Sequence, residues 1–245
     1  KGKITSKPYL SMTLALLKKI GVKTSFINNK ITVNPIKSLK PIICKIESDW
    51  SSLSYFYSIV ALSKNLTLRI SNYYSNSIQG DIKLIEIYKN LGVNSSFENN
   101  IICLKKDKNH KLPKKVVLDL NDNPDLAQTI AVSCFGLGLA CDLYGLKTLK
   151  IKETDRLLAL RKELVKLGGN IIVTNDSLHL KKSKEFKSNI CIMTYDDHRM
   201  AMAFAPLGII KPIIINDPMV VSKSFPDYWQ ALKKLNFKIS EYKIN

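Results

Sequence analysis

The chain has 245 residues, of which 45% are hydrophobic and 24% are charged. The hydrophobic share is too high for a disordered chain, and 10 Gly and 9 Pro are too few for a collagen-like or proline-rich one. The length allows one or two domains, each large enough to bury a hydrophobic core.

Basic residues outnumber acidic ones by 38 to 20, which gives a formal net charge of +18. Such an excess first suggests nucleic acid or a membrane surface as the partner. However, only four of the basic residues are arginines, and the other 34 are lysines spread along the whole chain without an aromatic cluster beside them. Nucleic-acid sites favour arginine forks and interleaved aromatic rings, so we expect a solvated lysine surface and no nucleic-acid partner.

The five cysteines contain no C-x-x-C pair, and their odd number and scattered spacing favour reduced thiols in the cytoplasm. The longest apolar run, residues 130–141, is too short to span a bilayer, so we expect no membrane partner. The first seven residues contain no Met and no signal-like stretch. We therefore expect the chain to begin partway through a longer protein.

The strongest pattern along the chain is a repeat of about seventy residues. Residues 17–26 (LKKIGVKTSF) match residues 88–97 (YKNLGVNSSF), and shorter copies follow at residues 165–170 and 232–237. The central residues of the four copies are 71, 76 and 68 positions apart: Gly21, Gly92, Gly168 and Asn236. Because an internal repeat marks a repeated structural unit, we expect the same unit several times.

Each central residue follows a helical pattern and precedes a hairpin pattern. In the first copy, Leu10, Leu14 and Leu17 share one helical face, and Gly21 suits the left-handed end of a helix. The turns that follow lie at residues 28–29, 99–100 and 175–176, with alternating runs at 30–33, 101–104 and 177–180. We therefore predict a helix and then a two-stranded hairpin in each of the first three copies.

A second helical pattern lies upstream and starts at an acidic residue. Asp49, Asp125 and Asp197 are 76 and 72 positions apart, and each precedes an apolar helix and a β-rich run such as residues 66–70 or 212–215. The unit is therefore strand, helix, strand, helix and hairpin. This order predicts an α+β fold of βαβαββ units, with half a unit at 1–46 and three units at 47–245, the last lacking most of its hairpin.

Three further acidic residues, Asp81, Asp155 and Asp227, stand where the outer helices are expected to begin. N-capping would account for an acidic residue at each of the six starts. It does not account for the other charged side chains at the same starts: Glu153, Arg156, His198, Arg199 and Lys223. Helix N-termini attract anions, and a pseudo-threefold packing would aim several of them at one place. We therefore expect a site for a ligand that carries phosphate or carboxylate.

Three segments resemble signatures of the 5-enolpyruvylshikimate-3-phosphate (EPSP) synthase family. They are residues 152–157 (KETDRL), 195–202 (YDDHRMAM) and 223–228 (KSFPDY). Further matches follow the family's order at residues 6–9 (SKPY), 49–52 (DWSS), 79–81 (QGD) and 124–125 (PD). The resemblance covers essentially the whole chain, and the motifs together are very specific.

The resemblance implies a fold and a reaction. Each of the family's two domains holds three βαβαββ units in a pseudo-threefold, inside-out barrel arrangement. The reaction transfers the enolpyruvyl group of phosphoenolpyruvate to the 5-hydroxyl of shikimate 3-phosphate and releases phosphate, through a tetrahedral addition intermediate. It belongs to the shikimate pathway, which leads to chorismate and the aromatic amino acids. The resemblance also implies no metal, no organic cofactor and a monomer.

The resemblance assigns roles to two carboxylates. Asp125 contacts the ring hydroxyls of the substrate and accepts a proton, and Glu153 donates a proton to the methylene carbon and later accepts one. These roles suit the reaction, because the attacking hydroxyl must lose a proton and the methylene carbon must gain one. For Glu153, the alternative is a capping role or an ion pair with Lys152 or Arg156.

The resemblance also implies a set of substrate-binding residues. Arg156, Arg199 and Lys223 would hold the phosphoenolpyruvate anion, because guanidinium forks match carboxylate and phosphate. Lys152 would contact a shikimate hydroxyl, and Ser6 and Tyr9 would lie near the shikimate phosphate. For His198 we favour a structural, orienting role beside the acidic residue that precedes it.

Some positions depart from the family pattern. Lys150 stands where the family often has Arg, and Thr148 stands where some members have an Asn that contacts the substrate. The family's other catalytic Lys, its Ser-Ser-Gln phosphate segment and a further Arg would all precede Lys1. We therefore expect residues 1–46 to be the tail of the upper domain and 47–245 to be the lower domain, with the missing N-terminal half as an essential partner.

Three other functions stay open at this point. The chain could be a UDP-N-acetylglucosamine enolpyruvyl transferase, which shares the fold and the chemistry, although the segments at 152–157 and 195–202 favour the shikimate branch. It could be a basic nucleic-acid-binding module, which would need clustered lysines on one face. It could also be a catalytically inactive paralogue, against which the retained charged residues argue.

Overall fold

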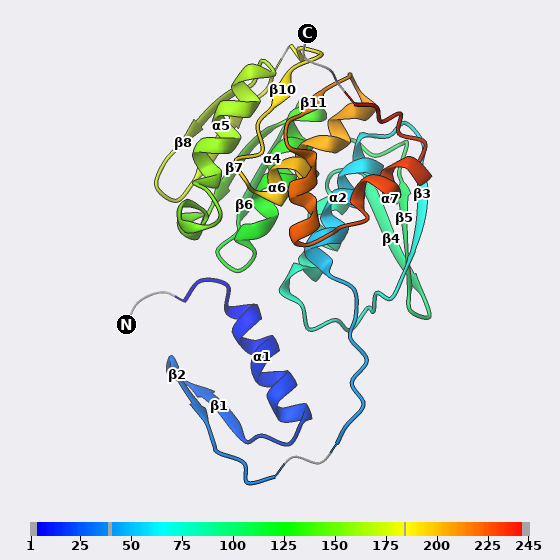
Figure 1. The fold of residues 1–245 in the computed structure, drawn as a ribbon. Helices are drawn as coiled ribbons and strands as arrows, with labels where there is room; N and C mark the ends of the chain where they lie inside the picture. Colours follow the sequence, from blue (N-terminus) through cyan, green and yellow to red (C-terminus); the bar gives the residue numbers. More distant parts are fainter. Residues whose placement is uncertain (1–3, 39–40, 184, 242–245) are drawn as a thin grey trace.

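The computed structural model describes residues 4–38, 41–183 and 185–241, which form a small N-terminal group beside a larger body (Figure 1). The N-terminal group contains α1 (Lys7–Lys19), β1 (Thr24–Ile27) and β2 (Lys30–Val33), and the two strands form an antiparallel hairpin. Its helix comes close to the body at Gly80, where a Cβ atom would lie 2.5 Å from the Cβ of Pro8. Glycine is therefore needed at this contact.

The body repeats one order of elements three times. The first unit contains α2 (Trp50–Leu62), β3 (Thr67–Ser71), η1 (Gly80–Lys83), α3 (Leu84–Lys89), β4 (Val93–Glu98) and β5 (Ile101–Lys106). The second contains β6 (Lys115–Asp119), η2 (Pro124–Leu126), α4 (Ala127–Gly136), β7 (Ala140–Tyr144), η3 (Lys147–Ile151), α5 (Arg156–Lys166), β8 (Asn170–Val173) and β9 (Leu178–Lys181). The third contains β10 (Cys191–Ile192), α6 (His198–Phe204), η4 (Ala205–Ile209), β11 (Ile214–Ile215), η5 (Pro218–Lys223) and α7 (Tyr228–Lys234). The mixture of helices and sheets confirms the predicted α+β class.

Each unit builds its own sheet, with strand orders β3-β5-β4, β6-β7-β9-β8 and β10-β11. The second unit is the most complete. Its strands β6 and β7 pair in parallel across α4, and β9 then pairs antiparallel with both β7 and β8. A parallel pair needs a crossover helix and an antiparallel pair needs only a turn, so the βαβ half and the hairpin half of the unit have different connections.

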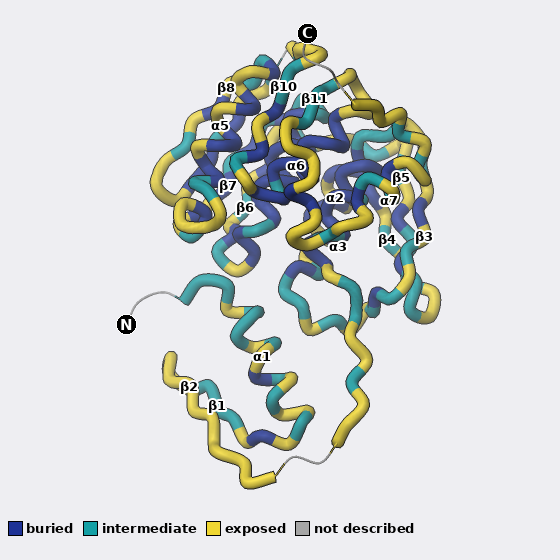
Figure 2. The backbone as a smooth tube through the Cα atoms, viewed as in Figure 1, coloured by how far each residue is buried: buried dark blue, intermediate teal, exposed yellow. Residues whose placement is uncertain are grey.

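Three central helices, α2, α4 and α6, fill the middle of the body (Figure 2). Ten of the 13 residues of α2, nine of the ten of α4 and six of the seven of α6 are buried, as expected for helices that are apolar on every side. Ser54 bonds to Thr129 at 3.0 Å and Ser58 bonds to Ser133 at 2.8 Å. Because both pairs advance by four residues, α2 and α4 are parallel and begin at the same end.

The residues at the centre of the sequence repeat have the conformation that the pattern predicted. Gly21, Gly92, Gly168 and Asn236 all have positive φ, at 94°, 81°, 101° and 65°. Each lies just beyond a helix, and the first three lead into the predicted hairpins β1-β2, β4-β5 and β8-β9. The prediction of the helix ends and hairpins is thus confirmed.

Three predicted strands are absent or short. Residues 41–48 contain no strand, so the first unit begins directly with α2, and Ile43 in this stretch is fully exposed. The stretch is tied to the body by the bond from the Ser48 N–H to the Asn72 carbonyl at 2.9 Å. In the third unit β10 and β11 have two residues each, and no strand follows α7 in the described part of the chain.

The acidic residues at the helix starts do not all cap. Asp49, Asp155 and Asp197 accept backbone N–H bonds from the first turns of α2, α5 and α6. Asp227 stands at the N-cap of α7 without a side-chain capping bond. Asp81 and Asp125 lie inside the short helices η1 and η2, so capping is the wrong interpretation for these two.

None of the helices within the described residues is both long enough and apolar enough to cross a membrane. The boundary that we expect at residue 46, between the tail of one domain and the body of another, stays a prediction.

Candidate active site

The starts of α4, α5 and α6 meet around one buried arginine. Arg156 is the first residue of α5, and only 1% of its surface is exposed. Its Nε donates to Asp197 at 2.6 Å, its Nη1 to Asp125 at 3.0 Å and its Nη2 to Glu153 at 2.6 Å. A guanidinium has five donors in a fixed plane, so a single side chain can bridge three carboxylates from three segments.

Asp125 is surrounded by positive charge. Besides Arg156, it contacts Arg199 Nη2 at 3.2 Å and Lys152 Nζ at 3.3 Å. Burial alone would raise the pKa of the Asp125 carboxyl, but Arg199, Lys152 and Arg156 together outweigh burial and hold the pKa below its ordinary value. Asp125 is therefore ionised at neutral pH, at the point where three cationic side chains converge.

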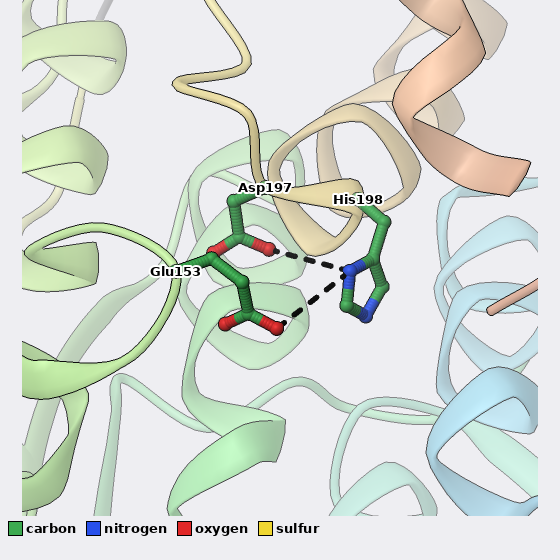
Figure 3. A group of neighbouring side chains, drawn as sticks. All are labelled: Glu153, Asp197 and His198. Atoms are coloured by element: carbon green, nitrogen blue, oxygen red, sulfur yellow. Dashed lines mark ion pairs between the residues drawn. The ribbon is translucent and has the colours of Figure 1, made fainter. Parts of the chain in front are cut away.

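Glu153 is the more open of the two predicted carboxylates. Its side chain is 35% exposed, against 18% for Asp125, and it lies between η3 and α5. Figure 3 shows it facing Asp197 and the ring of His198, whose Nδ1 is 3.9 Å from a carboxylate oxygen of each. Burial and then Arg199 lower the pKa of His198, so the imidazole is neutral at neutral pH. This neutral ring lines the site and makes no ion pair.

Glu153, Asp197 and His198 are also the one group among the described residues whose ligand atoms are close enough to share a metal ion. The two carboxylates already share Arg156, which bonds each of them at 2.6 Å. A cation placed here would compete with a buried guanidinium for the same oxygens. The charge of this group is therefore balanced by an arginine.

Lys223 lies outside this network. Its Nζ donates to the carbonyl oxygen of Asp196 at 2.7 Å and to the Asp196 carboxylate at 2.6 Å. Because Asp196 directly precedes Asp197, the ammonium group lies one residue away from the partner of Arg156. The Lys223 side chain is 40% exposed, so it can exchange this pair for a ligand.

Tyr9 and Ser6 approach the site from the N-terminal group. The phenol of Tyr9 lies near Ser51 and Asp81, and burial, followed by the charge of Asp81, raises the pKa of Tyr9. Ser6 donates its backbone N–H to the Asn121 carbonyl at 2.9 Å, in the loop that leads to Asp125. Ser6 therefore borders the loop that carries Asp125, and Tyr9 lies near Asp81, which accepts a hydrogen bond from Asn123 of that loop.

Thr148 lies in η3, the short helix that precedes Lys152 and Glu153. Its Oγ1 is buried and has no hydrogen-bond partner among the described residues. Lys150, in the same helix, donates to Asn175 in the β8-β9 turn at 2.9 Å. A substrate contact for Thr148 stays a prediction.

Three residues of this region were missed as site residues. Asp197 is fully buried and binds Arg156, although the sequence presented it as a helix start. Asp81 is 1% exposed and accepts from Ser51 Oγ at 2.6 Å and from Asn123 Nδ2 at 3.0 Å. Glu163 is fully buried in α5, seven residues after Arg156. For Glu163, the available signal was a carboxylate on the apolar face of a helix, where a leucine would be expected.

The fold places the chain in one structural class. It superposes on EPSP synthase from Acinetobacter baumannii with a TM-score of 0.73, covering 91% of this chain and 53% of that one, at 21% identity. It superposes on the enolpyruvyl transferase NikO from Streptomyces tendae with a TM-score of 0.66, covering 94% and 53% of the two chains, at 12% identity. The chain therefore has an enolpyruvyl-transferase fold.

Sequence similarity specifies the family. The family model for EPSP synthase (3-phosphoshikimate 1-carboxyvinyltransferase) matches residues 1–232. The 3-phosphoshikimate 1-carboxyvinyltransferase of Bacteroides fragilis is 42% identical over 97% of this chain and 58% of its own length. The enzyme of the same name from Buchnera aphidicola is 38% identical over 95% and 54%. This chain belongs to the EPSP synthase family, and it spans little more than half the length of these relatives.

Proposed function

We propose that the protein containing this chain transfers the enolpyruvyl group of phosphoenolpyruvate to the 5-hydroxyl of shikimate 3-phosphate. The products are EPSP and inorganic phosphate, which places the protein in the shikimate pathway toward chorismate and the aromatic amino acids. The observation that carries this proposal is the cluster in which Lys152, Arg156 and Arg199 converge on Asp125. Both substrates are anions, and this cluster supplies the positive charge that they need.

Asp125 and Glu153 divide the proton transfers. The 5-hydroxyl oxygen attacks C2 of phosphoenolpyruvate and loses its proton to Asp125. Glu153 protonates C3, which gives a tetrahedral intermediate that carries a methyl group. Glu153 then removes a proton from that methyl group, the bond from C2 to the phosphate oxygen breaks, and phosphate leaves with the electron pair.

The low pKa of Asp125 is compatible with its role as a base. Arg199, Lys152 and Arg156 hold the pKa down while they point at this carboxylate. When two anionic substrates bind, the same cations share their charge with phosphate and carboxylate groups, so Asp125 becomes more basic. Substrate binding thus prepares the base.

The remaining residues bind and orient the substrates. Arg156, Arg199 and Lys223 hold the phosphoenolpyruvate anion. Lys152 and Thr148 contact the shikimate ring. Ser6 and Tyr9 lie toward the shikimate phosphate, and His198 orients the carboxylates beside it. Residues 1–46 belong to the tail of the upper domain and 47–245 to the lower one, and the portion found in the longer relatives completes the site. We propose a monomer in the cytoplasm, and the five free cysteines support a reducing compartment.

The test is phosphate release by the full-length gene product that carries residues 1–245. We expect release from phosphoenolpyruvate only when shikimate 3-phosphate is added, and none with UDP-N-acetylglucosamine or unphosphorylated shikimate. Release with UDP-N-acetylglucosamine alone would support the other enolpyruvyl transferase activity. Absence of release with every acceptor would support the inactive paralogue.

A further inference from the structure

The turn that leads into α6 has an unfavourable backbone. Tyr195 and Asp196 are consecutive non-glycine residues with positive φ, at 54° and 56°. This conformation is unfavourable for a residue with a side chain and persists only where its surroundings hold it. The turn ends at Asp197, so its geometry sets where Asp197, His198 and Arg199 lie.

Glu163 holds this turn from the opposite side. Its Oε2 accepts the backbone N–H of Met193 at 3.1 Å, and its Oε1 accepts the hydroxyl of Tyr195 at 2.6 Å. Lys166 Nζ lies 2.7 and 2.8 Å from the two oxygens and balances the buried charge. Burial and Glu163 raise the pKa of Tyr195, so the phenol keeps the proton that it donates.

The helix α5 therefore holds the 193–197 segment at two points. Arg156 and Glu163 are seven residues apart and share one face of α5, because seven residues make about two turns. Arg156 binds Asp197 at the end of the segment, and Glu163 binds its beginning. Between the two points, the Asp196 carboxylate accepts a hydrogen bond from Lys223. The position of this turn thus determines the spacing of Arg199 and Lys223.

We propose that Glu163 is a positioning residue that fixes the 193–196 turn and thereby the spacing of Arg199 and Lys223 for the phosphoenolpyruvate anion. The proposal rests on the function proposed above. An apolar residue on this face of α5 would stabilise the fold without the desolvation cost of a buried carboxylate. The carboxylate instead supplies two acceptors, which a leucine lacks, to two specific donors of the strained turn.

The test compares Glu163→Gln and Tyr195→Phe in the full-length gene product. Gln keeps one of the two acceptors, and Phe keeps the ring but removes the hydroxyl. We expect each to raise KM for phosphoenolpyruvate about 10-fold, the effect of losing a hydrogen bond to a charged group. KM for shikimate 3-phosphate should stay nearly unchanged. The matched control is Glu98→Gln, an exposed carboxylate paired with Arg69 on a distant hairpin, which should change neither constant.

A purely structural role would lower the melting temperature and leave both KM values unchanged for the folded fraction. That result, or an equal rise in the two KM values, would overturn the proposal. If Glu163→Gln fails to fold, Tyr195→Phe decides alone, because it removes a single oxygen. If the wild-type protein releases no phosphate, the proposed function fails. The positioning is then tested by the Kd of inorganic phosphate, which should rise in Tyr195→Phe and stay unchanged in Glu98→Gln; an unchanged Kd in Tyr195→Phe would contradict it.

Discussion

The first unit of the body and the two later units place an aspartate at the same position, ahead of the central helix, and use it differently. The side chain of Asp49 accepts hydrogen bonds within its own helix start, from the N–H groups of Ser51 and Ser52 and from the hydroxyl of Ser52. Asp125 caps nothing and contacts three cations, and Asp197 both caps α6 and binds Arg156. The aspartate at this position of the repeat therefore stabilises a helix start in the first unit and pairs with cationic side chains in the other two.

The difference follows from the neighbouring positions. The residue after the outer-helix aspartate is Ile82 in the first unit, Arg156 in the second and Tyr228 in the third. The second position after the central-helix aspartate is Ser51, Ala127 and Arg199 in the same order. At these two positions the second and third units thus supply one arginine each, and the first unit supplies none. The three units share their order of elements, and the charged residues of the site occupy positions at which the units differ in sequence.

The largest effect should come from Asp125→Asn compared with Asp49→Asn. In the full-length gene product, Asp125→Asn should lower turnover about 10²- to 10⁴-fold, because a proton acceptor is lost. Asp49→Asn should leave turnover near the wild-type rate, because Asn caps a helix as well as Asp does. Initial rates of phosphate release at saturating substrates measure both. Similar rates in the two variants would show that the aspartates of the first and second units are equivalent.

Local structure was largely predictable from the sequence, because it depends on local patterns. The four left-handed residues, including Asn236, and the three hairpins follow from turn chemistry and periodicity. The involvement of Arg156 and Arg199 in the site was also predictable. Arginines are scarce among the basic residues, and these two occur in the two strongest motifs. Their common target, Asp125, came from the family resemblance.

Burial and long-range pairing were not predictable, because neither is a property of a short segment. The helix α1 repeats the pattern of α5, yet α1 has one buried residue, Leu14, and α5 has six. The strand β2 is exposed throughout, whereas Leu178 and Leu180 of β9 are buried. Apart from Lys166, the hydrogen-bond partners of Asp81 and Glu163 come from segments that are 30 or more residues away. Only the assembled fold shows which polar side chains it encloses.

The next largest effect should be on stability, and it should distinguish Arg156 of the second unit from Arg69 of the first. Arg156→Lys should lower the free energy of unfolding by about 3 kcal/mol, because one ammonium group cannot bridge three carboxylates and would leave the fully buried Asp197 poorly paired. Arg69→Lys is the matched control, since Arg69 forms an exposed pair with Glu98, and it should have no measurable effect. Urea denaturation of the full-length gene product measures both. An equally stable Arg156→Lys variant would mean that the carboxylates do not depend on a planar guanidinium.

The last prediction compares the pH dependence that Asp81 and Asp125 give to stability. Burial raises the pKa of Asp81 above its ordinary value of 3.8, although bonds from Ser51 and Asn123 partly offset it. The folded state then holds this proton more tightly than the unfolded state does. The contribution of Asp81 to stability is therefore present below pH 3.8 and lost as the pH rises through the folded pKa.

The contribution of Asp125 to stability should depend on pH in the opposite direction. Its pKa is lowered, so its contribution is present above 3.8 and lost as the pH falls through the folded pKa. Denaturation of the wild type, Asp81→Asn and Asp125→Asn between pH 3 and 7 measures the two differences. As the pH rises, Asp81→Asn should gain stability relative to the wild type and Asp125→Asn should lose it. Slopes of the same sign would mean that the cations around Asp125 do not outweigh its burial. The pKa of Asp125 would then be raised, as the pKa of Asp81 is.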